Sequence, residues 1–158
     1  MIKLYRLTEE LREYWETWQH DDGSQIVHWG ELGTKGMTRF VKDSFFSKAE
    51  KKVKKEIESL QRQGFRELEP EWLVMIEYGL NGLDGEKALE KRYLIQDRMN
   101  QVLGWTALGH CDGGSIDTNS IEITNLVIDA ELAKTVIAAE LADTDFKDYL
   151  KIYHTKTG

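Results

Sequence analysis

Alternating apolar and polar positions dominate the first forty residues of the chain. Four segments are expected to be strands, and the first shows the period of two that is typical of half-buried strands. They cover residues 2–8, 14–19, 25–29 and 37–42. Turn-forming residues separate these segments, including the cluster Asp21-Asp22-Gly23. The pattern therefore predicts an antiparallel meander of four strands.

A helical pattern follows the fourth strand. Its apolar positions, spaced by three or four residues, are Ala49, Val53, Ile57 and Leu60. Ser47 and Glu50 have the spacing of a capping box, so we expect their side chains to cap the start of the helix. Gly64 followed by Phe65 is typical of a left-handed C-cap with a hydrophobic contact. The sequence thus predicts one helix that packs on the sheet.

A charged, aperiodic stretch around Pro70, the single proline of the chain, indicates a boundary between residues 1–69 and residues 70–158. Beyond it we expect elements in the order β-α-β-β-α-β, which is the ferredoxin-like arrangement. The predicted strands are 72–78, 105–111, 121–128 and 149–153, and the predicted helices are 86–103 and 130–142, with Asp129 as a cap. The fold class that follows is α+β, with two small modules.

The third predicted strand ends in Trp29-Gly30-Glu31 and runs into a glycine-rich turn that closes at Gly36, where glycine permits positive φ angles. With the preceding strands and the following helix, this hairpin resembles the WGR domain over residues 1–68. The resemblance implies an antiparallel sheet with one helix. In poly(ADP-ribose) polymerases such domains bind DNA ends through the Trp and the Arg. Here Glu31 stands at the Arg position and reverses the charge of the expected phosphate contact.

Charge is unevenly distributed along the 158 residues, whose formal net charge is −7. Residues 1–70 carry 13 basic and 13 acidic side chains, whereas residues 71–158 carry 8 and 15. Nucleic-acid-binding surfaces are usually basic, because cations release counterions from phosphates. The acidic second half is therefore a poor candidate for contact with nucleic acid.

The candidate binding residues lie on the hairpin, which we expect to be presented to a protein partner or, as the alternative, to nucleic acid. They are Trp29, Gly30, Glu31, Lys35 and Arg39. Trp29 also has a packing interpretation, in which its indole lies against the helix. The helix itself is rich in lysines between residues 48 and 55. The interleaved glutamates predict the ion pairs Glu50–Lys54, Lys52–Glu56 and Lys54–Glu58 of a solvated face.

An alternative function, a small enzyme, would use residues in the region 110–119. The residues in question are His110, Cys111, Asp112 and Asp117, and Asn119 adds a further oxygen ligand for a cation. The competing interpretation is an irregular, bulged hairpin. No nucleotide-binding motif or paired metal ligands are present, so we expect a non-enzymatic protein with no cofactor or metal. A single cysteine and the absence of a long apolar run indicate a cytoplasmic protein without membrane contact.

Overall fold

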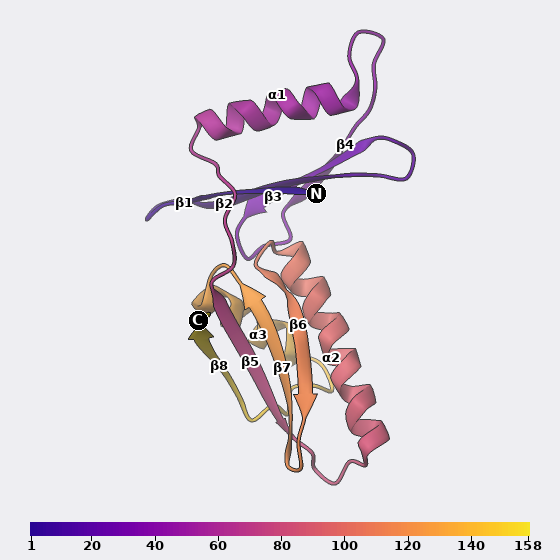
Figure 1. Ribbon diagram of the computed structural model, residues 1–158, viewed down its shortest axis with the longest axis vertical. Helices are drawn as coiled ribbons and strands as arrows, with labels where there is room; N and C mark the ends of the chain where they lie inside the picture. Colours follow the sequence, from indigo (N-terminus) through magenta and orange to yellow (C-terminus); the bar gives the residue numbers. More distant parts are fainter. The chain divides into compact units, whose positions relative to one another are not determined.

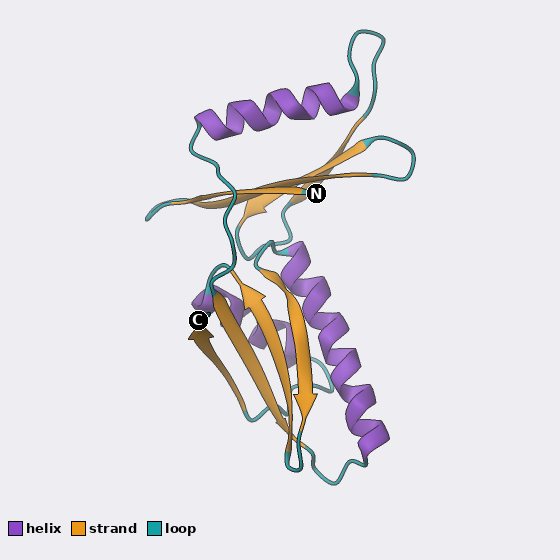
Figure 2. Ribbon diagram, viewed as in Figure 1, coloured by secondary structure: helices purple, strands orange, loops and turns teal.

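The computed structural model describes residues 1–158 and divides the chain into two compact units, Met1–Leu68 and Glu69–Gly158. The sequence placed this boundary one residue later. The fold class is α+β, with two four-stranded antiparallel sheets and three helices (Figures 1 and 2). None of the helices has both the length and the apolar character that crossing a membrane requires.

The first unit contains a meander in which each strand pairs with the next. Its strands are β1 (Ile2–Leu7), β2 (Arg12–Gln19), β3 (Gln25–Glu31) and β4 (Met37–Val41), in the spatial order β1-β2-β3-β4. The register places Trp15 opposite Trp29 and Glu16 opposite His28. Because successive side chains point to opposite faces, the two tryptophans share one face of the sheet and the Glu16–His28 pair lies on the other.

Helix α1 (Ala49–Arg62) lies against the face of the sheet that carries the tryptophans (Figure 1). The buried cluster between them consists of Leu4, Trp15, Val27, Val41, Ala49, Val53 and Phe65, with Trp29, Ile57 and Leu60 packed at its border. All four apolar positions predicted for the helix face therefore contribute to this core. Burial of such side chains, at about 25 cal/mol per Å² of apolar surface, is what holds the helix on the sheet.

The predicted capping box at the start of α1 is wrong. The N-cap residue is Lys48, whose side chain makes no capping hydrogen bond. The cap comes instead from Asp43, whose Oδ1 accepts from the backbone N–H of Ala49 at 2.7 Å. Asp43 also pairs with the Lys48 ammonium group. The loop after β4 thus brings in a carboxylate from six residues upstream, and the local Ser-x-x-Glu spacing gives no sign of it.

The end of α1 agrees with the sequence prediction. Gly64 has a positive φ of 96°. The N–H of Phe65 donates to the carbonyl of Leu60 at 3.1 Å, and the N–H of Gly64 donates to that of Gln61 at 3.1 Å. This pair of bonds is the Schellman motif, in which a glycine permits the left-handed turn and the next residue returns to the core.

The second unit contains six elements in the order β-α-β-β-α-β. They are β5 (Trp72–Gly79), α2 (Gly85–Trp105), β6 (Gly109–Ile116), β7 (Ser120–Val127), α3 (Ala130–Ala142) and β8 (Lys151–Lys156). The strands lie in the order β6-β7-β5-β8, and every pair is antiparallel. Helix α2 contacts β6 and β7, α3 contacts β5 and β8, and the helices contact each other. Asp129 caps α3 as predicted, because its carboxylate accepts from the N–H of Leu132.

The sequence predicted a strand over residues 105–111, and the structure corrects where this strand begins. Trp105 ends α2, and β6 begins only at Gly109. Between them Ala107 takes a positive φ of 58°, and the N–H of Leu108 donates to the carbonyl of Leu103. The apolar run 105–108 is therefore a helix C-terminus that returns to the core. A short apolar run alone does not distinguish such a terminus from a strand.

Candidate functional site

The hairpin between β3 and β4 is held by its own backbone. The carbonyl of Glu31 accepts from the N–H of Thr34 at 3.0 Å and from its hydroxyl at 2.7 Å. Gly36 has a positive φ of 58°, and a Cβ there would lie 2.2 Å from both the carbonyl oxygen of Trp29 and the hydroxyl of Tyr14. Gly30 is also crowded, since its Cβ would lie 2.8 Å from the Gly36 Cα. Both positions therefore require glycine.

Beneath the hairpin lies a buried polar cluster of Tyr14, Glu16 and His28, which sequence reasoning missed. His28 is fully buried, and its Nδ1 lies 2.7 Å from Glu16 Oε1. Its Nε2 lies 2.6 Å from the carbonyl oxygen of Lys35 and 3.1 Å from the Tyr14 hydroxyl. Each ring nitrogen thus lies within hydrogen-bond distance of an oxygen acceptor.

Two further contacts complete this cluster. Lys3 pairs with the second carboxylate oxygen of Glu16 at 3.2 Å, and Tyr14 donates its hydroxyl to the carbonyl of Thr34 at 3.0 Å. Burial, with a smaller contribution from Glu16, raises the pKa of Tyr14 to about 12, so the phenol remains a donor at neutral pH. These side chains anchor the hairpin to the sheet. The sequence places Glu16 and His28 on neighbouring predicted strands, but their pairing becomes evident only when the register of these strands is known.

Trp29 and Arg39 are brought together on the helical side of the sheet. Trp29 is half-buried at the border of the core, and the guanidinium carbon of Arg39 lies 5.7 Å from the centre of its ring. Arg39 also pairs with Glu56 of α1, and Glu56 accepts from the indole N–H of Trp15 at 3.1 Å. The packing interpretation of Trp29 therefore describes its contacts, and Arg39 already has an acidic partner.

The ion pairs predicted within α1 do not form. Glu56 is held by Arg39 and Trp15, and Lys52 donates to the carbonyl of Lys42 at 2.8 Å. Long-range partners thus take the side chains that helical spacing assigned to each other. Of the other hairpin candidates, Glu31 and Lys35 have exposed side chains. Of the five predicted binding residues, Trp29 and Arg39 contact each other, Gly30 is crowded by the hairpin backbone, and Glu31 and Lys35 are exposed.

Large apolar side chains are exposed on β4 and on the loop that follows it. We call this set the β4 surface; its members are Met37 (63% exposed), Phe40 (56%), Phe45 (96%) and Phe46 (92%). The rings of Phe45 and Phe46 contact each other edge to face, with centroids 5.2 Å apart. Phe45 and Phe46 are thus nearly fully exposed while their rings contact each other, and exposed apolar side chains of this kind are candidates for an interaction site. Sequence reasoning did not single out either phenylalanine.

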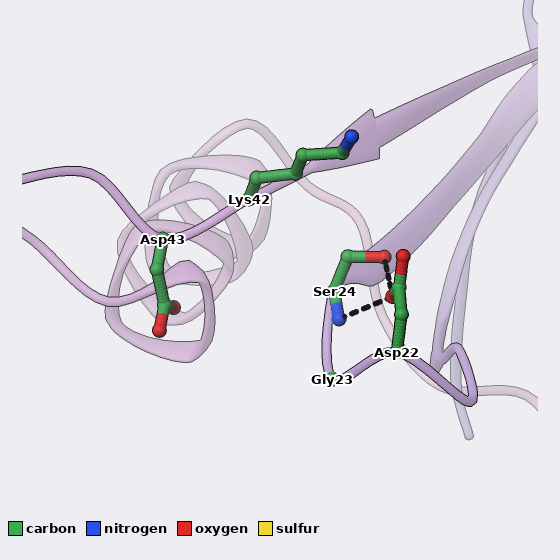
Figure 3. Close-up of a pocket in the computed structure, with 5 residues that line it drawn as sticks. All are labelled: Asp22, Gly23, Ser24, Lys42 and Asp43. Atoms are coloured by element: carbon green, nitrogen blue, oxygen red, sulfur yellow. Dashed lines mark hydrogen bonds between the residues drawn. The ribbon is translucent and has the colours of Figure 1, made fainter.

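A polar pocket of about 290 Å³ lies beside this surface, lined by Asp22, Gly23, Ser24, Lys42 and Asp43 (Figure 3). Oδ1 of Asp22 accepts from both the N–H and the hydroxyl of Ser24, chiefly the hydroxyl, and these bonds lower the pKa of Asp22 to about 2. Asp43 caps α1, and its pKa is likewise lowered, chiefly by the hydrogen bond from the N–H of Ala49 and then by Lys48. Both carboxylates are thus committed to holding loops, and Lys42 is the one basic side chain in the lining.

The candidates for the enzymatic alternative follow one strand and its turn in the second unit. His110 is exposed, whereas Cys111 is half-buried beside the carbonyl oxygens of Gly113 and Thr124, each 3.5 Å from its Sγ. Burial is the main reason that the pKa of the Cys111 thiol is raised. The register shifts between Cys111 and Gly113, which makes this the bulged hairpin that the competing interpretation predicted.

The acidic members of that set, Asp112 and Asp117, do not meet. Asp112 is exposed on β6, and Asp117 accepts from the N–H groups of Asn119 and Ser120 in the β6–β7 turn. No group of three or more His, Cys, Asp or Glu side chains is close enough to hold a metal ion. The hairpin bonds of Asp117 therefore account for its position.

Comparison with known proteins gives no match: neither a family model, nor a curated protein, nor a solved structure resembles this chain significantly.

Proposed function

We propose that the protein is a non-catalytic binding or accessory protein whose N-terminal unit engages a protein partner. The observation that carries this proposal is the β4 surface, where four large apolar side chains stand exposed within ten residues of sequence. Lys35 and Glu31 lie exposed on the adjoining hairpin. Trp29 and Arg39 contact each other, and Gly30 is crowded by the backbone of this hairpin. Aromatic side chains and methionine, together with a polar rim, are typical of protein interfaces.

We further propose that the two units are a WGR-like module and a ferredoxin-like module. Support for the first comes from the four-stranded meander, the Trp-Gly hairpin and a single helix that ends at Gly64. Support for the second comes from the β-α-β-β-α-β order with antiparallel strands arranged β6-β7-β5-β8. Neither assignment names an activity, because one fold serves many functions.

Binding of nucleic acid through the N-terminal unit is the second candidate. Residues 35–55 contain eight basic and two acidic side chains, which favours contact with phosphates. Against it, Arg39 is paired with Glu56, and Glu31 is exposed on the hairpin. We expect weak binding of duplex DNA at physiological salt and an increase on Glu31→Arg that shrinks as salt rises. Sub-micromolar, salt-sensitive binding by the unaltered chain in a fluorescence titration would favour this candidate instead.

Site-specific photo-crosslinking tests the main proposal. A photoreactive benzoylphenylalanine replaces Phe45 in the full chain, expressed in the cells that naturally make it. A matched control carries the same group in place of Tyr93, an exposed aromatic residue of α2. We expect a discrete protein adduct from position 45 and none from position 93. Adducts that disappear on nuclease treatment, or equal adducts from both positions, would overturn the proposal.

A further inference from the structure

We infer that β4 accepts an added strand: an extended, acidic segment of the partner, with apolar side chains at alternate positions, pairs with its free edge. This inference rests on the proposed function and specifies the chemistry of the partner. Extended segments that join an exposed sheet edge gain affinity from main-chain hydrogen bonds and specificity from alternate side chains. Three features of the described chain support it, namely the open edge, the side chains beside it and the local charge.

The edge of β4 is open. It is the last strand of the order β1-β2-β3-β4, and it pairs only with β3 (Figure 1). In an antiparallel pair, successive residues turn their N–H and C=O groups alternately toward the partner strand and away from it. About half of the backbone groups of β4 therefore face outward. None of them takes part in a loop or turn hydrogen bond.

Two of the other three sheet edges are covered or interrupted. On β1, Tyr5 exchanges two backbone hydrogen bonds with Arg66, at 2.8 and 2.9 Å. On β6 the ladder is broken by the bulge after Cys111, whose N–H donates to the side chain of Asn100. The third edge, β8, pairs only with β5 and has a lysine at each end, whereas β4 has Lys42 directly after its last residue. Bulges, coverage and lysines are the usual means by which proteins prevent pairing at sheet edges.

Side chains suited to such pairing flank the edge on both faces. Met37 and Phe40 lie on opposite faces of β4, so an added strand with apolar side chains on one of its faces would contact one of them. Apolar pairs between neighbouring strands stabilise a sheet. Phe45 and Phe46 follow directly and offer a further apolar contact. The added segment is thus expected to carry apolar residues at every second position.

Charge selects an acidic segment and disfavours a second copy of this chain. Residues 35–55 have a net charge of +6, from eight basic and two acidic side chains, in a protein whose total is −7. Two copies joined antiparallel through β4 would bring both basic segments together, although Arg39 itself is paired with Glu56. Like charges directly opposite one another are destabilising. An acidic strand meets the same edge with attraction.

Peptide selection on the full-length protein tests the inference. A displayed library of random twelve-residue peptides is selected on the immobilised chain, and the enriched peptides are synthesised and titrated by fluorescence anisotropy. We expect acidic sequences with alternating apolar residues. Lys42→Glu should weaken their binding by about fivefold or more at low salt, and less as salt screens the charge. Lys87→Glu, an exposed lysine at the start of α2, is the matched control and should leave binding unchanged.

Backbone methylation distinguishes strand addition from other modes while the protein stays unaltered. Two versions of the best peptide carry N-methyl groups on alternate amides, one on the odd positions and one on the even. Only one set of amides faces β4, so one version should lose about tenfold or more in affinity and the other little. Amide signals of residues 37–41 should shift in NMR spectra on binding.

The outcomes separate this inference from the proposed function. Basic or uniformly apolar peptides, equal effects of both methylation patterns, or binding insensitive to Lys42→Glu would overturn strand addition. Should the Phe45 crosslink to a protein persist in that case, the partner binds the β4 surface in another way. Concentration-dependent dimerisation in sedimentation, abolished by Phe40→Ser, would show a second copy at this edge instead of an acidic partner.

Discussion

Gly36→Ala tests most directly whether the hairpin adopts the described geometry. Three costs arise together at this position. The left-handed conformation costs a residue with a Cβ about 1–2 kcal/mol. The new methyl would lie 2.2 Å from the carbonyl oxygen of Trp29 and 2.2 Å from the hydroxyl of Tyr14, where the first atom belongs to the backbone and cannot rotate away. Forced overpacking of this kind costs about 1–3 kcal/mol.

Relief of this clash moves the loop and weakens the hydrogen bonds that anchor it. These are the bonds from Tyr14 to Thr34 and from His28 to Lys35. With net contributions of about 0.5–1.5 kcal/mol each, the total destabilisation by Gly36→Ala is about 3–5 kcal/mol. That is a large part of the free energy of unfolding of a typical domain, which is about 5–15 kcal/mol. We therefore expect the first unit to unfold at much lower denaturant concentration.

Gly23→Ala is the matched control. Gly23 also has a positive φ, of 86°, yet a Cβ there meets nothing within 4 Å. Its substitution should cost only the conformational part, about 1 kcal/mol. Urea unfolding of the full chain, followed by amide NMR signals of each unit separately, measures both variants without assuming a single transition. Equal losses from the two substitutions would refute the described packing of the hairpin.

Three further predictions concern the helix, the thiol and the acid limit of stability. Ile57→Ala should cost about 2 kcal/mol in urea unfolding, the low end for a core isoleucine because its side chain is only partly buried, whereas Lys54→Ala should stay within about 0.5 kcal/mol. Cys111 should react slowly with iodoacetamide at neutral pH, since burial raises its thiol pKa; rapid labelling would instead support the enzymatic alternative. The pKa of Asp43 is lowered by the N–H of Ala49 and then by Lys48, so its contribution is present above the ordinary pKa of an aspartate and is lost as pH falls through the lowered value. Asp43→Asn should reduce the dependence of stability on pH in this acidic range, and an unchanged acid profile would contradict the cap.

The parts of the fold that the sequence predicted correctly depend on patterns within short segments of the chain. The alternation of residues 2–42 predicted the meander, and the Gly64-Phe65 pair predicted a C-cap that forms through two backbone bonds. Asp129 was identified as the cap of α3 because the carboxylate lies three residues before the N–H that it binds. In each case the interacting groups are close in sequence, so pattern and geometry coincide.

The incorrect predictions concern side chains whose actual partners lie in another element of the structure. Asp43 caps α1 across a loop, where Ser47 had the better local spacing. Glu56 binds Arg39 of β4 in place of Lys52 of its own helix. A helix ion pair gains only about 0.2–0.5 kcal/mol, so a partner on a neighbouring strand readily displaces it. Sequence spacing describes what a side chain can reach within its element, and tertiary packing decides which partner it takes.

The sequence predicted where the candidate site lies, but it did not predict which of its side chains are packed and which are exposed. The Trp-Gly signature located the hairpin, yet it gave no sign that Trp29 would be covered by Arg39 and that Phe45 would be nearly fully exposed. Period-two and period-3.6 patterns report which residues an element buries, and Phe45 lies in a loop where neither pattern applies. Exposure of a loop residue is a property of the surrounding chain. It becomes evident only when the course of that chain is known.

Both faces of the first sheet contain buried side chains, and this is why the binding surface that we propose lies at an edge. One face is covered by α1, and on the other the hairpin is anchored through Tyr14 and the Glu16–His28 pair. Any partner that displaced the hairpin would break the hydrogen bonds that the buried His28 ring and the Tyr14 hydroxyl make to the carbonyls of Lys35 and Thr34, which is costly for buried groups. Addition at β4 breaks none of these contacts, because the outward backbone groups of that strand and the rings of Phe45 and Phe46 are already exposed to water. The least costly way for this unit to bind a protein is therefore to extend its sheet by one strand.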